Sequence, residues 1–280
     1  MTTATSAPEY PRAALPEARG RAGLAGAILS EWTKIRTVRS TYWTIFALAV
    51  ISLGLAAGVS WGQATALKDP HRHIIAVDAT ATPLFMFLLL GPLVIAVLGA
   101  LVITSEYSTG MVRTSLTVQP RRAVVYAAKL AVFAVLAFVV SIVIAFAAFF
   151  IGQSMLSSAG VSVTLSHPNT LRAIFGAALY VTAAGLLAYA LGAILRHTAG
   201  AIALAAVILL VFQLMVGFLP TSWQNEVIRW LPTSSWQPLV STHPSVNPHL
   251  FSIWPQFGVT AGWVVVLLII GGVLFRTRDA

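Results

Sequence analysis

Six long stretches without a charged side chain constrain this sequence more than any other feature. They lie between Arg39 and Lys68, Asp78 and Glu106, Lys129 and Arg172, Arg172 and Arg196, Arg196 and Glu226, and Arg229 and Arg276. A helix rises about 1.5 Å per residue, so roughly 20 apolar residues cross a hydrocarbon core of about 30 Å. Each stretch contains such a run. The sequence therefore predicts an all-α polytopic membrane protein with six transmembrane helices.

The composition supports this fold class. Hydrophobic residues make up 58% of the chain and charged residues 9%, whereas soluble domains carry about 25% charged residues. The net charge of +9 could indicate nucleic acid, but the basic residues lie at the ends of the apolar runs. That distribution is typical of contact with anionic lipid headgroups. We therefore expect membrane lipids, and no nucleic acid, among the partners.

The predicted spans form one domain over residues 21–280, preceded by a tail, residues 1–20, that we expect to be disordered. The spans are Thr41–Gly62, Pro83–Ile103, Leu130–Gly152, Ala173–Leu195, Gly200–Leu219 and Phe257–Phe275. An even number of spans leaves both termini on one side, and thirteen of the 17 Lys and Arg residues fall on that side. Basic loops stay in the cytoplasm. Both termini are thus predicted to be cytoplasmic in a multi-pass plasma-membrane protein.

An amphipathic helix is predicted ahead of the first span. Its apolar face is expected to hold Leu24, Ile28, Ile35 and Val38, with Trp32 adjacent. Its other faces hold Glu31, Lys34, Arg36 and Arg39. This pattern is typical of a helix that lies in the membrane interface.

The connection between Pro220 and Gln256 is rich in tryptophan and proline. It contains Trp223, Trp230, Trp236 and Trp254, half of the eight tryptophans. Tryptophan rings favour the headgroup level of a bilayer. We expect a short interfacial or re-entrant helix that ends at Pro232; an ordinary aromatic belt is the alternative.

Several kinds of chemistry are missing from the sequence. A Walker A loop needs glycine directly before its lysine, but Lys34, Lys68 and Lys129 follow Thr, Leu and Ala. All eight acidic residues fall outside the predicted spans, which disfavours an ion-coupled carrier that uses a buried carboxylate. Na⁺ sites made of carbonyls and hydroxyls would escape this argument. We expect no enzymatic activity and no cofactor in this chain.

The first outer loop contains a conceivable metal-binding set. Two histidines, His71 and His73, lie near Asp69 and Asp78. Their spacing is irregular, and Lys68 and Arg72 repel cations, so a solvated loop without metal is favoured.

A few polar residues and one glycine repeat lie within the spans. The polar residues are Gln213, Ser141, Thr182, Tyr180 and Tyr189. Each is more readily explained by a contact between helices than by a substrate; if any line a translocation path, we expect Gln213 first, then Tyr180 and Thr182. Gly54, Gly58 and Gly62 repeat every four residues, which permits close helix approach either within the chain or in a dimer.

The loop after the second span is the most informative polar segment. It reads Ser105-Glu106-Tyr107-Ser108-Thr109-Gly110-Met111-Val112-Arg113-Thr114-Ser115-Leu116. Ser105 and Glu106 suit the start of a short helix, where the dipole favours negative charge. Pro120 would end the segment before the basic residues that begin the next span.

This loop resembles that of permease subunits of bacterial type-two ABC exporters. The resemblance rests on Glu106, Gly110, Leu116, Pro120-Arg121 and Ala128-Lys129, and on the N-terminal segments Ser30–Lys34 and Arg39–Trp43. It implies two facing six-span permeases, the second a copy or a homologue, each seated on a separate ATP-binding subunit that binds ATP and Mg. The coupling helix that contacts this subunit would contain Glu106, Tyr107, Gly110, Met111, Arg113 and Leu116. A connecting helix would contain Glu31, Trp32, Lys34 and Arg36.

The expected function is therefore that of the permease subunit of an ATP-driven exporter. The apolar and hydroxylated candidates for its path favour a hydrophobic or amphiphilic cargo over an ion. Two alternatives stay open: an ion-coupled secondary carrier, and a non-transporting membrane partner of an ATPase.

Overall fold

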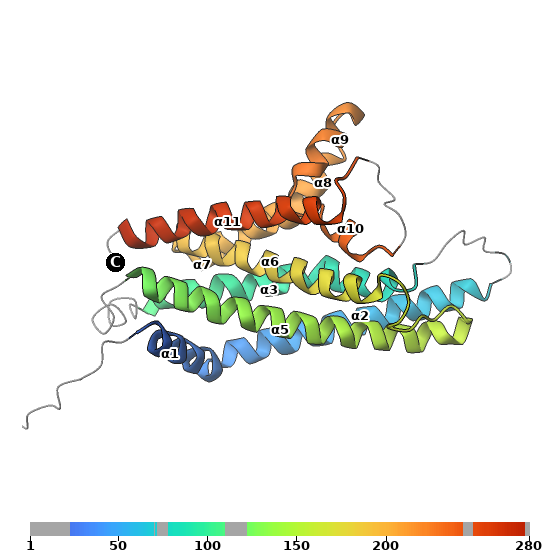
Figure 1. Ribbon diagram of the computed structural model, residues 1–280, viewed down its shortest axis with the longest axis horizontal. Coiled ribbons are helices and arrows are strands. Elements are labelled where there is room, and N and C mark those ends of the chain that lie inside the picture. Colours follow the sequence, from blue (N-terminus) through green and yellow to red (C-terminus); the bar gives the residue numbers. More distant parts are fainter. Residues whose placement is uncertain (1–22, 70, 72–77, 110–121, 243–248, 278–280) are drawn as a thin grey trace, which may run out of the picture.

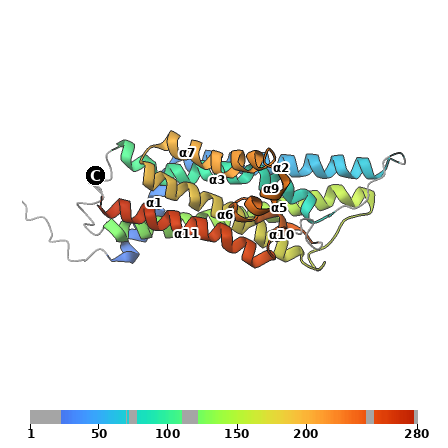
Figure 2. The ribbon, with the colours of Figure 1, turned by 90° about the horizontal axis from the view of Figure 1, so that it is seen from above.

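The computed structural model describes residues 23–69, 71, 78–109, 122–242 and 249–277, and all regular structure in these ranges is helical. The helices form an elongated bundle (Figures 1 and 2). The predicted all-α class is confirmed. The tail 1–20 lies outside the described residues.

Six helices are long and apolar enough to cross a membrane, as predicted. They are α2 (Arg39–Leu67), α3 (Ala81–Thr109), α5 (Arg122–Leu156), α6 (Thr170–Leu195), the continuous run α7 (Thr198–Ala206), η2 (Val207–Val211) and α8 (Phe212–Val216), and α11 (Ile253–Thr277). Most are longer than the predicted spans because helix continues past the apolar run into its polar flanks. The chain is therefore a multi-pass membrane protein.

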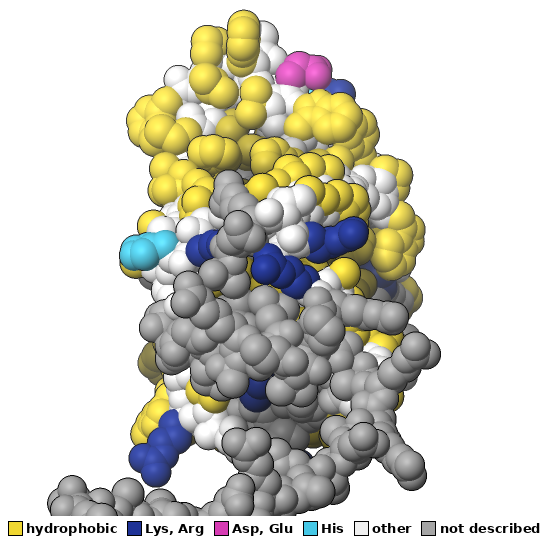
Figure 3. All heavy atoms as spheres, turned by 90° about the vertical axis from the view of Figure 1, so that its left-hand side faces the viewer, with side chains coloured by type: hydrophobic (Ala, Val, Ile, Leu, Met, Phe, Trp, Pro, Cys, Tyr) yellow, Lys and Arg dark blue, Asp and Glu magenta, His cyan; other side chains and the backbone are white. Residues whose placement is uncertain are grey.

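The two ends of the bundle differ. At one end, here the α1 end, α1 (Leu24–Thr37) lies across the start of α5, and α11 also finishes there (Figure 1). At the opposite end, here the α10 end, α9 (Thr221–Trp230) and α10 (Trp236–Val240) connect α8 to α11. Figure 1 shows α8 and α9 leaning away from the bundle while α10 returns to it. Figure 3, a view onto the α1 end, shows several Lys and Arg side chains there.

The centre of the bundle is α6, in which 78% of an apolar stretch of 18 residues is buried. It is rich in Ala and Gly, so neighbouring helices approach its backbone closely. At Gly99 of α3, an added Cβ would lie only 2.2 Å from the carbonyl oxygen of Gly185. Aromatic rings fill the wider gaps: Phe133 of α5 stacks on Tyr189 of α6, with ring centroids 5.8 Å apart.

The glycine repeat of α2 faces outward. A Cβ at Gly54, Gly58 or Gly62 would have nothing within 4 Å. Packing of this stripe inside the chain, one of the two predicted alternatives, is therefore wrong. The stripe faces the surroundings of the bundle because the buried face of α2 is formed by residues such as Ser52, Ala56 and Ser60.

The predicted helix start at Ser105 is also wrong. Both Ser105 and Glu106 lie inside α3, which continues to Thr109. The Thr104 hydroxyl donates to the carbonyl of Ala100 at 2.8 Å and accepts from the Thr198 hydroxyl of α7 at 2.7 Å. Packing against α7 thus stabilises this part of α3, and the helix continues beyond Ser105 and Glu106, where a helix start was predicted.

Candidate functional site

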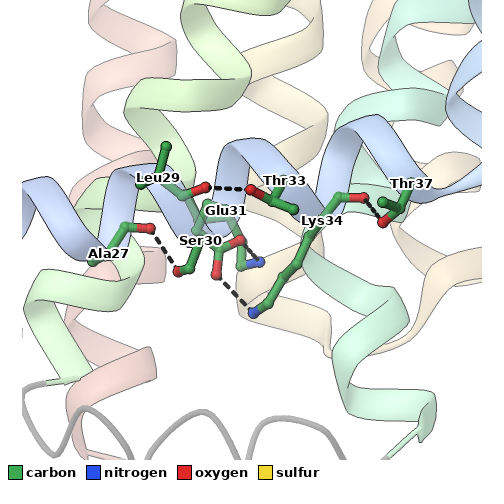
Figure 4. A network of polar contacts seen from close by, with 8 residues as sticks. Ala27, Leu29, Ser30, Glu31, Thr33, Lys34 and Thr37 are labelled. Atoms are coloured by element: carbon green, nitrogen blue, oxygen red, sulfur yellow. Dashed lines mark hydrogen bonds and ion pairs between the residues drawn. The ribbon is translucent and has the colours of Figure 1, made fainter. Parts of the chain in front are cut away.

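The α1 end is organised around the carboxylate of Glu31. Lys34, one turn later in α1, donates to its Oε1 at 2.8 Å, and Lys129 of α5 donates to its Oε2 (Figure 4). Glu31 is 3% exposed and Lys129 is 2% exposed. This buried ion pair fixes α1 against α5.

The buried residues of α1 differ from its predicted apolar face. Glu31 and Ile35 form its buried face, whereas Leu24, Trp32 and Val38 are exposed. The prediction placed Glu31 on a different face from Ile35, but the ion pair with Lys129 buries the two side chains together. Among the predicted connecting-helix residues, Trp32 and Arg36 are exposed, Lys34 is half-buried and Glu31 is buried.

Of the predicted coupling-helix residues, the structure describes the side chain of Tyr107 alone. Its ring packs inside the α1 end, with the guanidinium carbon of Arg196 5.1 Å from its centroid and the ring of Phe275 at 6.4 Å. Glu106 belongs to α3, but its side chain is not among the described ones. The remaining members, Gly110, Met111, Arg113 and Leu116, lie outside the described residues.

Two of the three predicted path residues line one cavity of about 170 Å³. Tyr180 of α6 and Gln213 of α8 meet there, beside Pro92 of α3 and Trp236 of α10. The Gln213 side-chain oxygen accepts from the Thr233 hydroxyl at 2.8 Å. The third residue, Thr182, does not line the cavity, and its hydroxyl donates to the carbonyl of Ala178 in its own helix at 2.7 Å.

The cavity adjoins an irregular part of the fifth span. Leu209 and Leu210, which also line it, belong to the π-helical segment η2. Wider π turns are frequent at functional sites because they displace side chains from the regular helical pattern. The cavity therefore combines irregular backbone, an apolar wall and a few polar groups, as small-molecule sites do, in a volume smaller than the roughly 300–1,000 Å³ that such sites usually have.

A polar cluster at the α10 end holds the segment after α10. Arg172, in the first turn of α6, donates from Nη1 to the carbonyl of Pro238 at 2.9 Å and from Nη2 to that of Ser241 at 2.7 Å. Asp78 accepts the backbone N–H of Thr242 through Oδ2 at 2.7 Å and caps α3 through Oδ1. We call Asp78 and Arg172 the α10 latch.

Sequence reasoning missed the α10 latch. From the sequence, Asp78 is suggested only as a possible metal ligand. Arg172 is only one of the few basic residues outside the predicted cytoplasmic side. The available signal was the isolation of Arg172 between two charge-free stretches. Of the other proposed metal ligands, His73 lies outside the described residues, and no group of metal-binding side chains occurs among the described ones.

One face of α11 also binds the connection between α8 and α11. Gln256, Thr260 and Trp263 donate to the carbonyls of Arg229, Pro232 and Trp230 at 2.8, 2.7 and 2.9 Å. The predicted short helix in this connection is confirmed as α9. The buried residues Leu239 and Val240 of α10 return the chain to the bundle, in agreement with a re-entrant segment.

Arg172→Lys is expected to loosen the segment after α10. A guanidinium reaches two carbonyls through its rigid fork, whereas an ammonium acts as a point charge and cannot reproduce that geometry. We expect amide exchange in residues 239–242 to accelerate about tenfold, since hydrogen bonds to charged groups contribute about 1.5–3 kcal/mol each. Hydrogen–deuterium exchange with mass spectrometry measures this. Arg229→Lys, which alters a partly exposed ion pair with Glu226, is the control; equal exchange in both variants would contradict the role of Arg172.

Comparison with known families agrees with this architecture. No curated protein gives a match to the chain. The model of a family described as ABC-2 family transporter protein matches residues 27–226, which include nearly all of α1, the first five spans and most of α9. The chain belongs to the ABC-2 family of transporter proteins.

Proposed function

We propose that the chain is the permease subunit of an ATP-driven exporter that works with a separate ATP-binding subunit. Membership of the ABC-2 family over residues 27–226 carries this proposal. The sequence supports a separate energy source because none of its three lysines follows a glycine, as a Walker A loop requires. A second permease, either another copy or a homologue, completes the path.

The proposed ATP-binding subunit docks at the α1 end, which faces the cytoplasm of a cell whose plasma membrane holds the bundle. The Lys and Arg side chains gathered there (Figure 3) support this orientation through the preference of basic residues for the cytoplasmic side. The docking surface comprises the polar exposed part of α1, which includes Arg36, and the segment from Glu106 to Leu116. Tyr107 is the exception within that segment, because its ring packs against Arg196 and Phe275.

The proposed cargo is hydrophobic or amphiphilic. The cavity that holds Tyr180 and Gln213 is lined mainly by Leu, Phe, Pro and Trp. Such a wall offers an ion little compensation for its lost hydration, whereas an apolar compound gains from contact with it. The Thr233–Gln213 pair supplies hydrogen-bonding groups for a polar end of the cargo.

Reconstitution of the permease with its ATP-binding partner tests the proposal. We expect the two chains to co-purify and to export a fluorescent amphiphile from liposomes only when ATP and Mg are present. A partner variant that lacks its Walker A lysine is the control and should abolish export. Export that continues without nucleotide and collapses with an ionophore would indicate a secondary carrier. ATP hydrolysis by a complex that moves none of a panel of amphiphiles would indicate a non-transporting partner.

Charge reversal in the docking segment should separate hydrolysis from transport. We expect Arg113→Glu and Glu106→Lys each to lower ATP-dependent export about tenfold. A repulsive contact that costs about 1.4 kcal/mol shifts the equilibrium between docked and undocked subunits tenfold. Hydrolysis by the complex and the melting temperature of the permease should change little. Arg229→Glu, at the α10 end, is the matched control. Normal export by both docking variants would remove these residues from the interface.

A further inference from the structure

A second cavity, of about 300 Å³, lies between α1, the start of α2, α3 and α5. We call it the α1 pocket. It is separate from the cavity of Gln213 and Tyr180, and it shares no lining residue with that cavity. Its size is at the lower end of small-molecule sites, about 300–1,000 Å³. It can therefore hold a headgroup and the first part of an acyl chain.

The α1 pocket is amphipathic along the bundle axis. Its α3 wall consists of Leu98, Leu101, Val102 and Ser105, which share one helical face at i, i+3, i+4 and i+7. This face changes from apolar to polar toward the α1 end. Ser40 and Thr41, in the first turn of α2, also line the pocket. The polar part of the pocket thus lies nearest the α1 end.

Charged groups form that polar part. Lys34, Lys129 and Glu31 all line the pocket, and both ammonium groups donate to the one carboxylate. The Lys34 side chain is 33% exposed, whereas that of Lys129 is 3% exposed. An ammonium has three N–H donors and can hold a carboxylate and a phosphate oxygen at the same time. Lys34 is the cation that a ligand entering the pocket can reach.

The position of α1 identifies the source of the ligand. Leu29 and Trp32 of α1 are exposed on one side of a helix that lies across the end of a membrane-spanning bundle (Figure 1). A helix with such a face lies at the boundary between headgroups and acyl chains. The polar part of the pocket therefore lies at headgroup level, and the Leu98 part lies at the depth of the acyl chains.

We propose that the α1 pocket binds one anionic phospholipid of the leaflet at the α1 end. Its phosphate contacts Lys34 and the neighbouring hydroxyls, and the start of an acyl chain lies along Leu98, Leu101 and Val102. Bound in this way, the lipid joins α1 to α2, α3 and α5. The inference concerns lipid binding and does not depend on the transport function.

Native mass spectrometry of the full, delipidated chain in detergent tests this site. We expect phosphatidylglycerol to be retained in preference to phosphatidylcholine, with one copy bound most tightly. Lys34→Gln should weaken that copy about tenfold, because a charge-assisted hydrogen bond is lost. Leu101→Trp should weaken it similarly by filling the apolar part. Lys68→Gln, which removes an exposed cation outside the pocket, is the matched control and should retain the lipid.

Three results would overturn the proposal. Equal retention of the two lipids would exclude recognition of the anionic headgroup. Equally tight binding of glycerol phosphate would identify free phosphate rather than lipid as the ligand. Unchanged retention in Leu101→Trp, with a melting temperature like that of the native chain, would place the lipid elsewhere; if that variant does not fold, unchanged retention in Lys34→Gln leads to the same conclusion.

Discussion

Gly99→Ala is expected to destabilise the bundle by about 3 kcal/mol, at the upper end of the effects seen for overfilled cores. The added methyl carbon would lie 2.2 Å from the carbonyl oxygen of Gly185 and 3.1 Å from the ring of Phe133. The nearer obstacle is backbone, which cannot rotate away as the end of a side chain can. Helices α3 and α6 would have to move apart, although α6 is the most buried of the six spans. Thermal unfolding in detergent, followed by circular dichroism, measures the effect.

Gly58→Ala is the matched control for this prediction. A Cβ at Gly58 meets nothing within 4 Å, so no packing is lost within the chain. Alanine is a better helix former than glycine by about 1 kcal/mol, and the melting temperature should stay unchanged or rise slightly. Equal destabilisation by the two substitutions would show that the close contact of α3 with α6 at Gly99 is not the cause of the loss.

The six spans could be predicted because the bilayer imposes their length. A run of about 20 apolar residues must satisfy its backbone hydrogen bonds internally, and a helix does so. That requirement acts on each segment separately, so it can be read from local sequence. It also explains why the predicted boundaries are short: α5 begins at Arg122, before the apolar run itself, because helix also extends through polar flanks.

Contacts between residues far apart in the sequence determine the features of the fold that local sequence could not predict. The buried face of α1 depends on Lys129, which is 98 positions from Glu31. Amphipathic patterning places a carboxylate on the solvent side unless a partner for it is known. Arg172 likewise acts on carbonyls 66 to 69 positions away. Such pairs leave no periodic signal in either segment.

The candidate cavity brings together two of the three polar residues that sequence reasoning selected as possible path residues. Gln213 and Tyr180 stood out because polar side chains are costly within a membrane and need partners. The same argument selected Thr182, which satisfies its hydroxyl within its own helix and lines no part of the cavity. A serine, threonine or tyrosine in a span can be recognised from sequence, but its hydrogen-bond partner depends on tertiary packing.

Glu31→Leu should be the most destabilising change in α1, by about 3–5 kcal/mol. The substitution removes the carboxylate that forms an ion pair with Lys129. The Lys129 side chain is buried. Removal of one partner from a buried ion pair leaves a charge whose desolvation is no longer offset. Glu226→Leu is the control, because Glu226 forms an ion pair with Arg229 at an N–O distance of 3.0 Å but its side chain is 68% exposed. We expect that change to cost less than about 1 kcal/mol.

The double variant Glu31→Leu with Lys129→Met separates the two explanations of this loss. If loss of the Glu31 contact from the buried Lys129 ammonium is responsible, the double variant should recover most of the stability, since apolar side chains of similar size often replace a buried ion pair without loss. Lys34 needs no new partner because its side chain is one-third exposed. Denaturant unfolding of the purified chain in detergent gives the three free energies. A double variant as unstable as Glu31→Leu would show that α1 and α5 are joined by the carboxylate contacts themselves, and that packing cannot replace them.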